Sequence, residues 1–203
     1  MARANIHAKR PAPKGLDFVP VEGGPDRLTF GVVRRQIGNG PTQTAGETIL
    51  RRLCPGMGAS VSEPWKPSCY RWDVLLPPNA PDACADPKQL CDLYEAQAFD
   101  TIKDLVIMAT LRFPDPDRLH QTWEQVRAFA FERLCQRNLA VVAAQHLPVL
   151  TGSTNPPHVH LMMPARKLRT YGFGGLVRPF ASDQGKQILA DELAQFMPGF
   201  VDA

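Results

Sequence analysis

The sequence has no apolar run long enough to cross a membrane, and its first residues lack the hydrophobic centre of a signal peptide. It has no Cys-x-x-Cys pair, and its cysteines are odd in number, at five. This argues against a disulfide framework and a zinc knuckle, and we expect reduced thiols in a cytoplasmic protein without a membrane partner. Lys and Arg together number 23 against 20 Asp and Glu. Net charge alone therefore points to no partner.

The distribution of charge is more informative than its sum. Residues 1–16 carry basic side chains and no acid, residues 82–132 are rich in Asp and Glu, and basic residues gather again after residue 165. This last group contains Arg166, Lys167, Arg169 and Arg178. A basic region separate from an acidic one is typical of a face that binds a polyanion, although two ordinary solvated surfaces would give the same pattern.

The order of predicted elements indicates one folded domain. Residues 1–26 are rich in Pro, Gly and charge, which predicts a disordered N-terminal tail, and residues 27–203 form the domain. Strands are predicted over 27–36, 70–76, 104–113, 140–147 and 159–164. Helices are predicted over 42–53, 86–103, from 115 or 117 to 134, and 183–196. This order predicts an α+β fold, with a mainly antiparallel sheet and its helices packed on one face.

Particular residues are expected to begin these helices. Thr42 lies near the start of the first, and Asp86 followed by Pro87 is a strong start for the second. Asp115 or Asp117 would cap the third.

His146 and His160 fall on the last two predicted strands, and His158 directly precedes the second of them; a turn-rich segment joins the two strands. Residues two apart in a strand point to the same face, so His158 and His160 project together while Val159 points to the core. If the hairpin closes, His146 reaches that face too. Three neutral imidazoles would hold a metal ion and leave coordination positions open. The alternative for a His-x-His pair is an ordinary half-buried surface pair, but the third histidine and the short hairpin favour a metal site.

The segment from Asn155 to Met162, with His146 before it and residues 171–174 after it, resembles the metal-binding hairpin of the MobA/MobL relaxases. These are plasmid mobilisation proteins of the His-hydrophobe-His endonuclease superfamily. The resemblance extends back through residues 75–81 and Leu111 to Pro114, and it covers about residues 73–174.

The resemblance implies a relaxase-like fold and a metal-dependent nickase that acts on single-stranded DNA in plasmid mobilisation. It implies a divalent metal ion (Mn, Mg or Zn) on the three histidines, and the plasmid origin of transfer and accessory mobilisation proteins as partners. Basic residues could track the DNA phosphates. The candidates are Arg34, Arg35, Arg166, Lys167 and Arg169.

The nucleophile is where the sequence departs from the family, which carries a tyrosine on a short helix after its first strand. The nearest match, residues 42–47, has Gln43 at that position, and glutamine cannot attack a phosphate. The family also has acidic residues in its third strand, where Met108 and Thr110 stand here.

The chain has only three tyrosines. Tyr94 lies on an apolar helical stripe and is expected in the core, which leaves Tyr70 and Tyr171 as candidate nucleophiles. Two other functions stay open: a catalytically inactive relative that binds metal and nucleic acid without cutting, and a histidine-site hydrolase of small substrates.

Overall fold

The computed structural model describes residues 27–36, 39–55, 65–99, 101–113, 116–152, 155–182 and 184–200. The predicted disordered tail, residues 1–26, and the predicted helix cap Asp115 lie outside these ranges.

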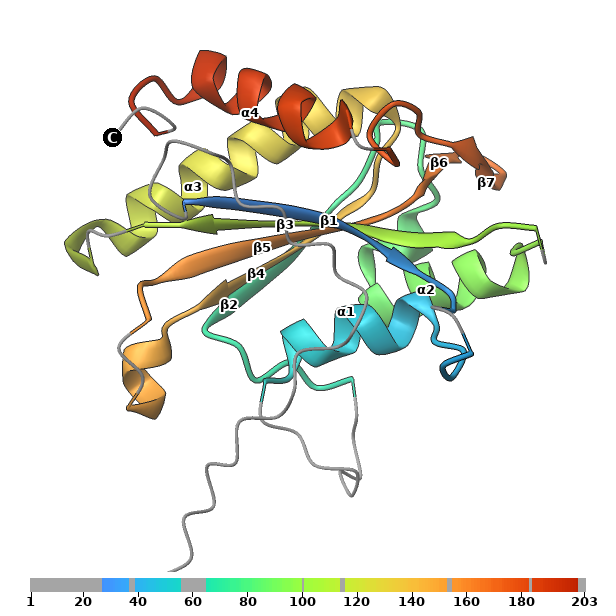
Figure 1. Ribbon diagram of the computed structural model, residues 1–203, viewed down its shortest axis with the longest axis horizontal. Helices are drawn as coiled ribbons and strands as arrows, with labels where there is room; N and C mark the ends of the chain where they lie inside the picture. The colour runs from blue at the N-terminus through green and yellow to red at the C-terminus, as the bar shows by residue number, and fades with distance from the viewer. Residues whose placement is uncertain are drawn as a thin grey trace, which may run out of the picture.

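A five-stranded sheet in the order β1-β3-β5-β4-β2 organises the fold (Figure 1). All four neighbouring pairs are antiparallel. Its strands are β1 (Leu28–Arg34), β2 (Arg71–Leu75), β3 (Asp104–Arg112), β4 (Val141–His146) and β5 (His158–Pro164). Each strand lies within two residues of its predicted bounds. The predicted α+β class with an antiparallel sheet is confirmed.

Helices cover both faces of this sheet, so the prediction of helices on one face is wrong. Figure 1 shows α3 (Leu119–Phe129) and α4 (Gln184–Phe196) on one side, and α1 (Ala45–Leu53) and α2 (Pro87–Ala96) on the other. The reason is visible in β3, where Ile107 joins the core beneath α3 while its neighbour Met108 joins the core beneath α1. A strand that is apolar on both sides needs cover on both.

Side-chain hydrogen bonds determine where the first two helices begin. Thr44, not the predicted Thr42, begins α1, because its hydroxyl accepts from the Glu47 amide while the Glu47 carboxylate accepts from the Thr44 amide. Asp86 caps α2 as predicted. That helix ends at Ala96, short of the predicted residue 103.

The third helix has no side-chain cap. It follows a 3₁₀ turn (Pro116–Arg118), so Asp117 does not cap it as predicted. It continues through a π-helical turn (Ala130–Leu134) and a short 3₁₀ turn (Cys135–Arg137).

A second, two-stranded sheet lies beyond the end of β5. It consists of β6 (Arg166–Arg169) and β7 (Gly172–Leu176). The seven residues of β5 span roughly 20 Å at 3.3 Å per residue. Because β5 begins at His158, the histidines and the small sheet lie at opposite ends of the large one. Within the described ranges, no helix has the length and apolarity needed to cross a membrane.

Candidate metal centre

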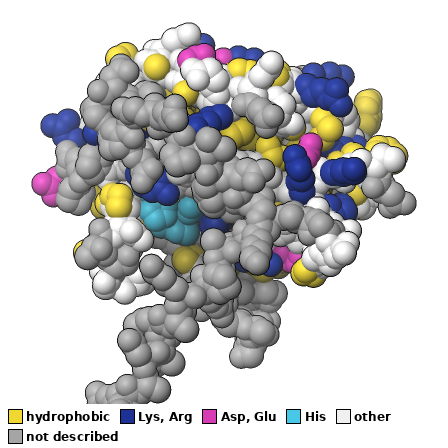
Figure 2. All heavy atoms as spheres, viewed as in Figure 1, with side chains coloured by type: hydrophobic (Ala, Val, Ile, Leu, Met, Phe, Trp, Pro, Cys, Tyr) yellow, Lys and Arg dark blue, Asp and Glu magenta, His cyan; other side chains and the backbone are white. Residues whose placement is uncertain are grey.

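The three predicted histidines meet at the end of two neighbouring strands. His146 is the last residue of β4 and pairs directly with His158 on β5, while His160 lies two residues further along. One ring nitrogen from each lies within 4.8 Å of those of the other two. Val159 between them is fully buried on the opposite face, as predicted. The side chains form one patch at the surface, with basic side chains beside it (Figure 2). These three residues could therefore hold a metal ion.

Each imidazole has one nitrogen engaged and one free for a ligand. Nε2 of His146 lies 2.6 Å from the Arg52 carbonyl oxygen, and Nδ1 of His158 lies 3.0 Å from that of Pro156. A carbonyl can only accept, so both rings donate there and keep a lone pair on the other nitrogen. Nδ1 of His160 lies 2.8 Å from the Thr110 hydroxyl. Hydrogen bonds of this kind orient the histidine ligands of metal sites, so the donor set fits a metal ion.

Burial keeps these rings neutral. It lowers the pKa of His146 to about 4, lowers that of His158, and lowers that of the almost fully buried His160 well below its ordinary value. The positive charge of Arg52 lowers all three pKa values further, and that of Arg112 lowers those of His158 and His160. The lone pairs are therefore available at neutral pH.

Arg52 and Arg112 are residues that the sequence did not single out. Arg112 ends β3 and pairs directly with His158. Arg52 comes from the last turn of α1, and among the described residues its buried Nε has no hydrogen-bond partner. Alternation along β3 could have revealed Arg112, two residues after Thr110. Only the packing of α1 on the sheet reveals Arg52.

Thr110 also acquires a role from the structure. It stands in the strand where the family resemblance leads one to expect acidic residues, and its hydroxyl bonds to His160. The partner of this histidine is therefore uncharged.

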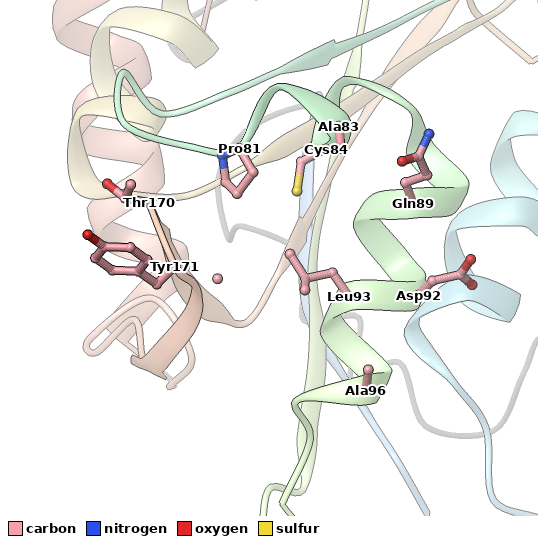
Figure 3. A pocket seen from close by; sticks show the side chains of 10 residues that line it. Pro81, Ala83, Cys84, Gln89, Asp92, Leu93, Ala96, Thr170 and Tyr171 are labelled. Atoms are coloured by element: carbon pink, nitrogen blue, oxygen red, sulfur yellow. The ribbon is translucent and has the colours of Figure 1, made fainter.

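The two candidate tyrosines lie at opposite ends of the sheet. Tyr70 directly precedes β2, and its amide donates to the carbonyl of Gln145, the neighbour of His146. It is 46% exposed. Tyr171 is 96% exposed in the turn between β6 and β7, across a pocket from Leu93 and Ala96 of α2 (Figure 3). The structure thus brings Tyr70, but not Tyr171, to the histidine end. Tyr94 is buried, as predicted.

Gln43 is not near the histidines either. Its side-chain amide donates to the Arg34 carbonyl at the far end of β1, just before α1 begins. The helix runs from there toward the histidines and reaches them at Arg52. Arg52, and not Gln43, is therefore the residue of this segment whose backbone contacts the cluster.

The predicted DNA-binding residues all lie at the end of the sheet remote from the histidines. Arg34 pairs with Asp104 at 3.7 Å, and Arg35 with Glu95 at 3.0 Å. Lys167 and the exposed Arg169 lie on β6. None of them approaches the histidine cluster.

Arg166 is a structural residue, so its prediction as a DNA contact is wrong. It is only 2% exposed. Its guanidinium donates to the carbonyl oxygens of Gly174, Gln97 and Phe173 at 2.6 to 2.7 Å. It therefore joins β7 to the end of α2 and has no surface to offer a phosphate.

Fold and site together define an α+β protein with a three-histidine candidate metal centre at one end of an antiparallel sheet. The same fold occurs in a solved structure from a study of the molecular basis of vancomycin resistance transfer in Staphylococcus aureus. The match has a TM-score of 0.62 and 18% identity, and it covers 85% of this chain and 90% of that one. It supports the relaxase-like fold expected from the sequence. No protein-family profile and no curated protein matches the chain.

Proposed function

We propose that this protein is a metal-dependent, relaxase-like protein that acts on single-stranded DNA in plasmid mobilisation. The observation that carries the proposal is the convergence of three neutral histidines, each with one nitrogen bonded and one free. The shared fold with a protein studied for resistance transfer agrees with it. The partner would be DNA at an origin of transfer, in the cytoplasm, with accessory mobilisation proteins.

His146, His158 and His160 would hold the metal ion. Among divalent ions, Mn²⁺ and Zn²⁺ suit imidazole ligands better than Mg²⁺ does. Once bound, the ion supplies Lewis-acid polarisation of a phosphate oxygen. The histidines contribute a fixed, neutral ligand set, because burial prevents protons from competing for their lone pairs.

Tyr70 is the proposed nucleophile for strand cleavage. Its phenolic oxygen would form a bond to phosphorus, the bond from phosphorus to one sugar oxygen would break, and that oxygen would leave with a proton as a hydroxyl. The phosphotyrosyl link keeps the bond energy for rejoining. Supporting this choice, Tyr70 is half-exposed and sits at the strand end beside His146.

A second candidate function is binding of metal and nucleic acid without cleavage. The feature that favours it is Arg52, which occupies the end of α1 that faces the histidines. The resemblance places a catalytic tyrosine on this helix, and an arginine there can bind a phosphate but cannot attack it.

Metal analysis tests the centre. Purified protein should contain or take up one divalent ion per chain, and replacement of His158 and His160 together by Ala should abolish this. His120→Ala is the matched control, because this exposed histidine lies on α3 outside the cluster. Equal metal content in the double variant would refute the proposed ligands.

Cleavage assays separate the two functions. A labelled single-stranded oligonucleotide library with Mn²⁺ or Mg²⁺, run on denaturing gels, should give a covalent protein–DNA adduct if Tyr70 cuts. Tyr70→Phe should remove the adduct, while Tyr171→Phe should not. Binding without an adduct in the unchanged protein would favour the non-cutting function, and an adduct that survives Tyr70→Phe would show a different nucleophile.

A further inference from the structure

The burial of Arg52 is not explained by its position at the end of a helix. Basic residues in the last turn of a helix commonly offset its dipole, and Arg51 and Arg52 both stand in the last turn of α1. Arg51 is exposed, as such a residue usually is. Arg52 is half-buried, and its Nε is buried with no hydrogen-bond acceptor among the described residues. A buried donor of this kind normally has an acceptor, so one is missing beside the histidines.

The backbone of Arg52 lies against the histidine cluster, and its positive charge acts on all three rings. Its carbonyl oxygen lies 2.6 Å from Nε2 of His146, so the last turn of α1 rests directly on the cluster. On the other side, Arg112 pairs in register with His158. Two guanidinium groups thus flank the three histidines, one from the helix and one from the neighbouring strand.

Among the described residues, no acidic side chain acts on the three rings. In the part of the chain that the structure describes, the charged side chains that lower the pKa values of the three rings are arginines and the histidines themselves, and the partner of His160 is the neutral Thr110. Neutral imidazoles leave the charge of a divalent ion undiminished. With that ion in place, the ion and the unpaired Nε–H of Arg52 would both attract an anionic ligand.

We propose that Arg52 is a phosphate-binding residue of the histidine centre, whose Nε–H donates to a phosphodiester oxygen at the open metal positions. This inference rests on the function proposed above and adds to it a residue that holds the substrate phosphate. Guanidinium suits the task because its donors form a planar fork that matches phosphate geometry, which a lysine ammonium does not reproduce.

The test compares neighbouring arginines on one helix. Arg52→Gln and Arg52→Lys are paired with the control Arg51→Gln, which removes a charge of the same sign one residue away but exposed. Each protein is loaded with Co²⁺ and titrated with inorganic phosphate, and the visible absorption of Co²⁺ reports anion binding. Binding of a fluorescent single-stranded oligonucleotide to the same samples is followed by anisotropy.

We expect all variants to keep one Co²⁺ per chain and the thermal unfolding of the unchanged protein. Arg52→Gln should need about tenfold more phosphate and oligonucleotide for half-saturation, since one charge-assisted hydrogen bond is lost. Arg52→Lys should be weakened as well, which a purely structural charge would not predict, and Arg51→Gln should match the unchanged protein. If the unchanged protein binds Co²⁺ and oligonucleotide but Arg52→Gln behaves like Arg51→Gln, the inference is overturned and the proposed function stands. Failure of the unchanged protein to bind Co²⁺ overturns both.

Discussion

Metal binding by the histidine centre should persist at a pH where most histidine sites fail. Imidazole binds a metal ion only when it is neutral, so protons compete with the ion below the pKa of the free site. Burial lowers the pKa of His146 to about 4 and lowers those of His158 and His160 in the same direction. The site without metal should therefore take up fewer protons than a site of ordinary histidines as pH falls from 7.5 to 5.5.

The expected magnitude follows from proton competition. A ligand with an ordinary pKa of about 6.5 loses roughly tenfold in affinity at pH 5.5, and three such ligands lose roughly 10³-fold. His146, with a pKa of about 4, is only a few per cent protonated at pH 5.5, and the lowered pKa values of His158 and His160 also reduce the competition by protons at these two ligands. We therefore predict that the metal dissociation constant changes less than about tenfold over this range.

Chelator competition with Zn²⁺ or Co²⁺ at pH 7.5 and 5.5 measures this change directly, with circular dichroism at both pH values to verify folding. The same pKa values determine how the stability of the metal-free protein depends on pH. Because the pKa values are lowered in the folded state, unfolded chains take up more protons than folded ones between pH 6.5 and 4. Stability of the metal-free protein should therefore decline as pH falls through this window. A loss of affinity near 10³-fold in folded protein would show that the rings titrate as exposed histidines and would refute the argument from burial.

Two further predictions concern residues near the two ends of the sheet. Arg166→Met should lower the free energy of unfolding by about 3–5 kcal/mol in urea denaturation, because three carbonyl oxygens lose the buried cation that donates to them. The control Arg169→Gln, on the same strand, should change this free energy by less than about 0.5 kcal/mol. Equal stability of the two variants would contradict the structural role of Arg166. Thr110→Val, which preserves shape, should weaken metal binding about 10- to 100-fold by removing the hydroxyl that orients His160, and an unchanged affinity in chelator competition would show that this hydrogen bond is dispensable.

Much of the local structure could be predicted from the sequence. Strands such as 104–113 are continuous apolar runs, and Asp86-Pro87 carries its own start signal, so short-range pattern was sufficient. The side-chain alternation of a strand also placed His158 and His160 on one face without knowledge of the fold. The first residue of a helix was harder to predict. Thr44 begins α1 in place of the predicted Thr42, because Thr44 and Glu47 exchange two hydrogen bonds that Thr42 does not form.

The roles of the charged side chains could not be predicted from the sequence. Arg166 and Arg52 each stand between an apolar and a basic residue in the sequence, yet the first is buried against three carbonyl oxygens and the second lies against the histidines. Nothing local distinguishes these environments, since the groups that surround each arginine come from elements distant in the chain. The same holds for Tyr70 and Tyr171, which strand order places at opposite ends of the sheet.

By itself, the sequence therefore determined the strands and the shared face of His158 and His160, because periodicity and turn chemistry act over a few residues. Tertiary structure alone decided that helices cover both faces of the sheet and that Arg52 and Arg112 flank the histidines. It also decided that the predicted basic residues lie at the other end. The physical reason is that a charged side chain acquires its role from its surroundings, and antiparallel pairing assembles those surroundings from separate segments of the chain.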